Sequence, residues 1–120
     1  MRRDENAERY VNRVLESYLA LPETPSRVSR WDRSLAHDLL RREVSLSTIE
    51  GAFLLASARR LCRPTEAPPL GPIRSLAYFL PVIDEVLHQP LPTDYLRYLK
   101  HKLATFSPKP NSRTPPTFPS

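Results

Sequence analysis

Proline is the residue that most constrains the fold of this chain, because fourteen prolines are spread over 120 residues that contain only two glycines. Proline removes a backbone donor, and it is poorly tolerated inside a helix or a central strand. Apart from Pro81, the prolines fall between segments whose apolar residues repeat with helical spacing, and again near the end of the chain. They therefore act as punctuation between helices, and we expect an all-α fold.

Apolar residues recur at steps of three and four in five segments, which is the spacing of one helix face. These segments run over residues 4–21, 29–42, 47–61, 73–89 and 94–106. A chain of this length suits one domain. We therefore predict a single orthogonal-type bundle of about five helices over residues 4–106, with proline-rich connectors and the third helix at the centre. A disordered proline-rich tail over residues 107–120 should follow.

Polar residues mark where several of these helices begin. Ser29 with Asp32, and Ser47 with Glu50, have the spacing of a capping box, in which each side chain bonds the other residue's backbone N–H. Thr93 suits the N-cap of the last helix. We therefore expect the second, third and fifth helices to start at these positions.

The helical spacing also predicts which side chains are buried. Trp31 leads the buried stripe of the second segment, and Tyr95 faces inward in the last segment together with Phe106. Pro81 lies within the fourth apolar segment, so we expect a kink or a break there.

Cysteine use and hydropathy indicate the compartment. The single cysteine, Cys62, argues for a reducing environment, and we expect it to pack as a small hydrophobe at a helix end. The charged start of the chain has no apolar signal-peptide core behind it, and no stretch approaches the ~20 apolar residues that span a bilayer. We therefore predict a cytoplasmic protein without a membrane partner. The tail is expected to be untethered, the alternative being a polyproline ligand for an aromatic groove.

Signals for an enzyme are weak. His37, His88 and His101 fall on three different predicted helices, without the paired spacing of a helical zinc site. Two glycines rule out the glycine-rich loops that bind dinucleotides or nucleoside triphosphates. Asp84 lies one turn before His88, a pair that would hold a metal only with ligands from another helix. The sequence predicts a non-enzymatic protein with no cofactor and no metal.

Residues 35–52 resemble the helix-turn-helix of bacterial DNA-binding proteins. An apolar residue and an alanine are followed by Leu39, a turn, and a serine-rich helix start with Ile49 buried. Glu43 stands where that motif usually has glycine, and the second helix becomes strongly apolar from Ala52 on, whereas a helix in the major groove keeps a polar face. An ordinary helical hairpin within the core is the alternative interpretation.

Arginines gather in the middle of the chain. Residues 27–63 hold eight arginines and four acidic residues, and the whole chain has a formal charge of +5. If the helix ends converge, these arginines form a patch that binds phosphates. The alternative is a set of solvated faces with scattered ion pairs. The predicted nucleic-acid contacts are Arg41, Arg42, Ser47, Thr48, Arg59, Arg60 and Arg63.

Four segments resemble parts of small, uncharacterised helical bacterial proteins associated with mobile genetic elements. The segments are Leu21–Arg27, Ala56–Arg60, Pro69–Leu76 and Tyr78–Ile83. The resemblance spans most of the chain up to Phe106 and implies a role near DNA. It implies no catalytic or binding residue.

Two functions are consistent with these observations. The first is a non-enzymatic, DNA-associated accessory protein for replication, recombination or regulation of a mobile element. The second is a helical protein-interaction module that docks a partner through an apolar groove beside Pro81 or through its tail. An exposed apolar patch around Tyr78, Val82 and Tyr98 would favour the second function, and a continuous arginine surface would favour the first.

Overall fold

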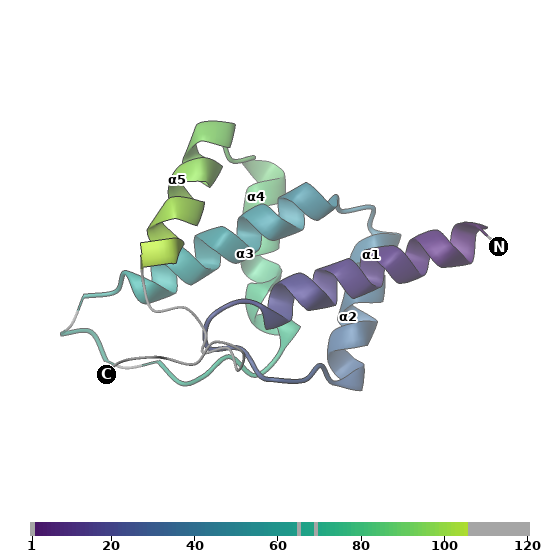
Figure 1. Ribbon diagram of the computed structural model, residues 1–120, viewed down its shortest axis with the longest axis horizontal. Coiled ribbons are helices and arrows are strands. Elements are labelled where there is room, and N and C mark those ends of the chain that lie inside the picture. Colours follow the sequence, from purple (N-terminus) through teal and green to yellow (C-terminus); the bar gives the residue numbers. More distant parts are fainter. Residues whose placement is uncertain (1, 65, 69, 106–120) are drawn as a thin grey trace, which may run out of the picture.

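The computed structural model describes residues 2–64, 66–68 and 70–105 of the chain. Within these residues the chain forms five α-helices and one short 3-10 helix, which confirms the predicted all-α fold (Figure 1). The elements are α1 (Arg2–Leu19), α2 (Arg30–Arg41), α3 (Leu46–Leu61), η1 (Leu76–Phe79), α4 (Leu80–His88) and α5 (Thr93–Thr105). The predicted tail, residues 107–120, and Phe106, which was predicted to face inward, lie outside the described residues.

Helix α3 is the centre of the fold, as its apolar sequence predicted. It packs against α1, α4, α5 and η1, and in Figure 1 it lies between α5 and α1. Half of its residues are buried, namely Ile49, Gly51, Ala52, Phe53, Leu55, Ala56, Ser57 and Ala58. A helix that is apolar on most sides needs neighbours on most sides, which is why the other helices gather around it.

Helix α2 begins as the sequence predicted. Ser29 is its N-cap, and the Ser29 hydroxyl and the Asp32 carboxylate bond each other's backbone N–H at 3.0 Å. Asp32 is also 1% exposed, and its second oxygen accepts a hydrogen bond from the Leu76 N–H at 2.9 Å. The same carboxylate therefore caps α2 and fixes the start of η1, 44 residues later.

Helix α2 ends in a Schellman motif. The N–H of Glu43 donates to the Leu40 carbonyl, and the N–H of Val44 donates to the Leu39 carbonyl. This motif places Glu43 in the left-handed region, with φ 61°. Left-handed backbone favours glycine, and this turn holds a glutamate there instead.

The predicted start of α3 was wrong by two residues. Ser45, not Ser47, is the N-cap, and the Ser45 hydroxyl accepts from the Thr48 N–H at 3.1 Å. Glu50 does not reach back to close a capping box at Ser47. Its carboxylate instead accepts from Arg13 at 3.0 Å and from Ser17 at 3.3 Å, both on α1. The Glu50 carboxylate therefore contacts α1 instead of the backbone N–H of Ser47.

The predicted break at Pro81 is confirmed. The chain runs as 3-10 helix to Phe79 and as α-helix from Leu80, so Pro81 lies in the first turn of α4, where its missing N–H costs no helical bond. Two inward positions were wrong, because Trp31 is 58% exposed and Tyr95 is 40% exposed.

Candidate nucleic-acid interface

The predicted contact residues fall into two groups at opposite ends of α3. Arg41 and Arg42 lie at the end of α2 and face the start of α3, which carries Ser47 and Thr48. Arg59, Arg60 and Arg63 lie at or just beyond the other end of α3. The helical hairpin therefore does not bring the seven residues into one patch.

The group at the start of α3 is occupied by local contacts. Arg41 pairs with Asp38 on its own helix, and Arg42 donates to the Asp84 carboxylate on α4 at 2.7 Å. The hydroxyls of Ser47 and Thr48 lie 3.3 and 2.9 Å from the Ser45 hydroxyl. All these side chains remain near the surface, but each cation already faces a carboxylate.

Arg59 is held by a two-pronged ion pair. Its two terminal nitrogens donate to the two carboxylate oxygens of Glu85 on α4 at 2.8 and 2.6 Å. The Arg59 hydrogen bond holds the pKa of the Glu85 carboxyl below its ordinary value. About half of the Arg59 side chain, 52%, remains exposed, so the guanidinium is paired and accessible at once.

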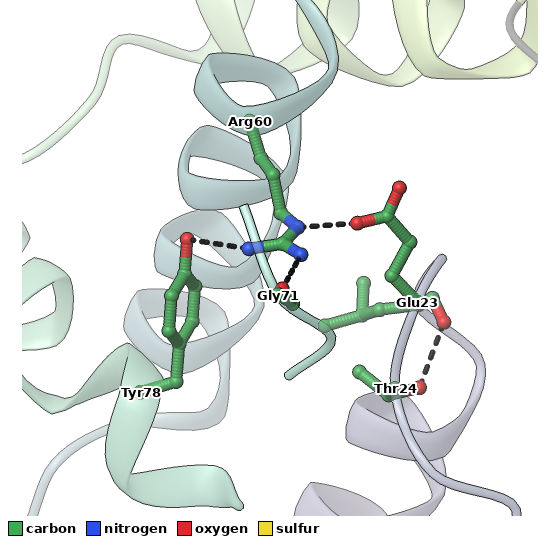
Figure 2. A network of polar contacts seen from close by, with 6 residues as sticks. Glu23, Thr24, Arg60, Gly71 and Tyr78 are labelled. Carbon is green, nitrogen blue, oxygen red and sulfur yellow. Dashed lines mark hydrogen bonds and ion pairs between the residues drawn. The ribbon is translucent and has the colours of Figure 1, made fainter. Parts of the chain in front are cut away.

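Arg60 is built into the fold. Its side chain is 6% exposed, and its guanidinium donates to Glu23 at 2.5 Å, to the Gly71 carbonyl, and to the Tyr78 hydroxyl at 3.4 Å. Figure 2 shows these three partners converging on the guanidinium from separate parts of the chain. The guanidinium carbon also lies 5.5 Å from the centre of the Tyr78 ring. Arg60 therefore ties the loop after α1 to the segment before η1.

Glu23 is the strained partner in this network. Its φ of 66° is in the left-handed region, which an L side chain rarely adopts. The Ile73 N–H donates to the Glu23 carbonyl at 3.1 Å, and the Glu23 carboxylate accepts from Arg60. The backbone carbonyl and the side chain of Glu23 are therefore each bonded to another segment, and these two bonds stabilise the left-handed backbone.

A surface hollow of about 270 Å³ lies at this end of α3. It is lined by Arg59, Arg60 and Arg63 and by the apolar parts of Leu70, Tyr78 and Val82, and no acidic residue lines it among the residues that the structure describes. We call it the arginine hollow. Arg63 donates a hydrogen bond to the Pro68 carbonyl at 2.6 Å. This partner is a neutral carbonyl group, so the bond does not neutralise the charge of Arg63.

A second hollow of about 330 Å³ lies between α3 and α5. Its walls include Arg59, Cys62, Tyr95, Tyr98 and Lys102, and we call it the tyrosine hollow. Arg59 lines both hollows, so they adjoin at its side chain. Cys62, expected to be packed, is exposed at the end of α3.

Sequence reasoning placed Tyr95 inside, named Tyr98 only as part of an apolar patch for a protein partner, and did not single out Lys102, although the distribution of acidic residues marks this end of the chain. Up to residue 96 the chain has thirteen basic and thirteen acidic residues, and from Arg97 to the end it has five basic residues and no acidic one. The net charge of +5 therefore belongs to the part of the chain from Arg97 on. The arginines in the middle of the chain lie in the part that is balanced overall.

Helix α3 has little free surface for reading a DNA groove. Its neighbours cover the face that contains Ala52, Phe53 and Ala56. A Cβ at Gly51 would lie 3.3 Å from a methyl of Leu96, so α5 packs directly on this helix as well. A helix in the major groove needs an exposed polar face. The exposed polar side chains of α3 lie only near its two ends.

The described residues show no arrangement for metal catalysis. Among them, no group of three or more histidine, cysteine, aspartate and glutamate side chains lies together to hold a metal ion. His88 uses its Nδ1 for the Asp84 backbone carbonyl at 2.8 Å, so the carboxylate one turn back is not its partner in this contact. No helix among the described residues is long and apolar enough to cross a membrane.

Comparisons with protein-family models, with curated proteins and with solved structures found no match to this chain. Its function must therefore be inferred from the side chains themselves.

Proposed function

We propose that this protein is a non-enzymatic, DNA-associated accessory protein that binds the phosphate backbone at the C-terminal end of α3. The main support is the arginine hollow, where three arginines and no acidic residue line one concave surface. Arginine matches phosphate oxygens with two parallel N–H donors. The resemblance to mobile-element proteins is the reason to expect a role in replication, recombination or regulation of such an element.

The three arginines of the hollow would contribute differently. Arg60 is committed to Glu23, Gly71 and Tyr78, and it would add mainly positive potential from within. Arg59 and Arg63 are the side chains that can turn to a phosphate. Exposed ion pairs contribute little to stability, so Arg59 can exchange Glu85 for a phosphate at small cost. Arg41, Arg42, Ser47 and Thr48 stay predicted contacts at the far end of α3.

Salt-titrated binding of a fluorescent DNA duplex to the full chain tests this proposal, over about 50 to 200 mM salt. Wild-type protein should bind at the low end and release the DNA as salt rises. Arg59→Gln and Arg63→Gln should weaken binding. Glu85→Gln should strengthen it by about two- to fivefold, because it frees Arg59 from its carboxylate.

Glu16→Gln is the matched control for the last variant, since it removes the same charge from an exposed position on α1. Glu85→Gln should strengthen DNA binding more than Glu16→Gln does. Absence of DNA binding at the lowest salt would refute the proposal. An affinity for DNA that is the same in Arg59→Gln, Arg63→Gln, Glu85→Gln and the wild type would refute it as well.

A protein-interaction module is the second candidate, and one observation favours it. Leu70 is 46% exposed and Tyr78 is 42% exposed in the same hollow, beside Val82 on α4. Exposed apolar side chains next to arginines are common in protein interfaces. A pull-down from native lysate, with and without nuclease, separates the two functions. A partner that survives nuclease, is lost in Leu70→Ser and is kept in Arg63→Gln would favour the module.

A further inference from the structure

The tyrosine hollow presents two aromatic rings to solvent. Tyr95 and Tyr98 are 40% and 52% exposed, and they are stacked with ring centres 5.9 Å apart and planes 21° apart. They lie one helical turn apart on α5, on the flank that faces the end of α3. Single exposed aromatic residues are ordinary, but a stacked pair in a concave surface is a ready platform for another flat ring.

Cations surround this pair. Lys102 lies 5.8 Å from the centre of the Tyr98 ring, and Arg59 lines the same hollow from α3. Arg97 and Lys100 add exposed positive charge elsewhere on α5, and no acidic residue follows Asp94 in the sequence. The surface therefore combines aromatic faces with a local excess of positive charge.

From this combination we infer that the protein binds single-stranded DNA, whose bases stack on Tyr95 and Tyr98 while its phosphates contact Arg59 and Lys102. Basic grooves with exposed aromatic rings bind single strands in this way, because every base has a flat face and every linkage has a negative charge. The inference rests on the proposed function and names the form of DNA that the surface prefers.

The arrangement favours a single strand over a duplex. In a duplex the faces of the bases are covered by their neighbours, so a surface tyrosine reaches them only after unstacking. Helix α3, the natural candidate for a major-groove helix, is covered by α1, α4 and α5. The two hollows adjoin at Arg59, so a flexible strand can follow them from the tyrosines toward Arg63.

The test measures anisotropy of a labelled thymidine oligonucleotide of about 15 nucleotides with the full chain, beside a duplex of the same length. Wild-type protein should bind the single strand more tightly. The double variant Tyr95→Leu/Tyr98→Leu should lose about tenfold in single-strand affinity and leave duplex affinity unchanged. Tyr95→Phe/Tyr98→Phe should retain single-strand affinity, because phenylalanine keeps the ring.

Trp31→Leu is the matched control, since Trp31 is an exposed aromatic residue on α2, away from α5 (Figure 1). It should not change binding, and circular dichroism should show that all variants fold. Polyglutamate, an anionic chain without bases, should compete far less well than unlabelled oligonucleotide. Equal competition would overturn the stacking inference and indicate an acidic protein partner.

The remaining outcomes separate the two proposals. Equal or tighter binding of the duplex, unaffected by the leucine variant, would overturn this inference and leave the proposed function standing. Absence of binding to either DNA at low salt would overturn both.

Discussion

The middle of the chain and its last helix use charged side chains in opposite ways. Around α3 and α4, arginines face carboxylates that come from other elements, as in Arg42 with Asp84, Arg59 with Glu85 and Arg60 with Glu23. Helix α5 contains three cations, Arg97, Lys100 and Lys102, and one acid, Asp94, which lies 3.5 Å from Arg97. Residues 46–88, from α3 to α4, contain four arginines and four acidic residues, whereas α5 has two more cations than acids.

The excess of cations over carboxylates, rather than the number of cations, therefore identifies a surface that binds an anion. An arginine that is paired and buried stabilises the fold. An arginine that is paired and exposed binds an anion only when the anion replaces its carboxylate partner. A segment with more cations than carboxylates keeps an excess of positive charge. Three variants and a pH titration probe this contrast, taken from the largest expected effect to the smallest.

The largest effect is expected from Asp32→Ala, within the balanced part. The Asp32 carboxylate is buried and accepts from the backbone N–H groups of Ser29 and Leu76. Its loss leaves the Leu76 and Ser29 N–H donors without this partner and removes half of the capping box of α2, which together cost about 3 kcal/mol. Urea denaturation measures the loss. A destabilisation below about 1 kcal/mol would contradict the structural role of this charge.

Arg60→Met should come next. Methionine replaces the aliphatic part of the side chain and removes the guanidinium, so the bonds to Glu23, Gly71 and Tyr78 disappear. Glu23 can turn to water, so the expected cost in unfolding free energy is about 2 kcal/mol, less than for a fully buried pair. Arg97→Gln on α5 is the control and should leave the denaturation midpoint unchanged. Equal losses of unfolding free energy in Arg60→Met and Arg97→Gln would contradict the contrast between the middle of the chain and α5.

Alkaline pH should weaken the part of the fold around α1. Burial raises the pKa of Tyr10 to about 12, against the opposing charge of Arg42, and burial with the charge of Asp32 raises the pKa of Tyr18 to about 12. A raised pKa in the folded state means that stability is present below the ordinary pKa of 10 and is lost as pH rises toward 12. Denaturation midpoints should therefore fall between these values. Tyr18→Phe should reduce the fall, and an unchanged slope would contradict the assignment.

The smallest effect is expected at the turn between α2 and α3. Glu43 holds a left-handed conformation that costs an L residue about 1 kcal/mol and glycine almost nothing. Glu43→Gly should therefore raise the unfolding free energy by up to about 1 kcal/mol, reduced by the greater freedom of glycine in the unfolded chain. Thermal denaturation gives the comparison. A lower midpoint would show that the Glu43 side chain matters more than its backbone.

Much of the fold could be predicted from local patterns. Prolines and apolar spacing located five helices, and the Ser29 cap and the break at Pro81 follow from residues within one turn. The start of α3 could not be predicted in this way, because Ser45 and Ser47 offer nearly the same local chemistry. What distinguishes them is that Glu50 bonds Arg13 and Ser17 on α1, more than thirty residues away.

The site was less predictable, for the same physical reason. An arginine's availability depends on its partner, and Arg42, Arg59 and Arg60 find theirs 42, 26 and 37 residues away. A helical wheel likewise gives the apolar face of α5 but not where that face ends, so Tyr95 is predicted inside although it lies at the rim. The sequence does mark where the acidic residues end, because none follows Asp94 at the start of α5.

The most direct test of the charge contrast compares how steeply single-strand affinity falls with salt in two variants. Lys102→Gln and Arg42→Gln each remove one positive charge, the first from the tyrosine hollow on α5 and the second from the end of α2. Each lost phosphate contact lowers the slope of log affinity against log salt by about 0.7. We expect a fall of about 0.7 for the lysine variant and a smaller one for the arginine variant. An equal or larger fall for the arginine variant would contradict the assignment of the DNA surface to α5.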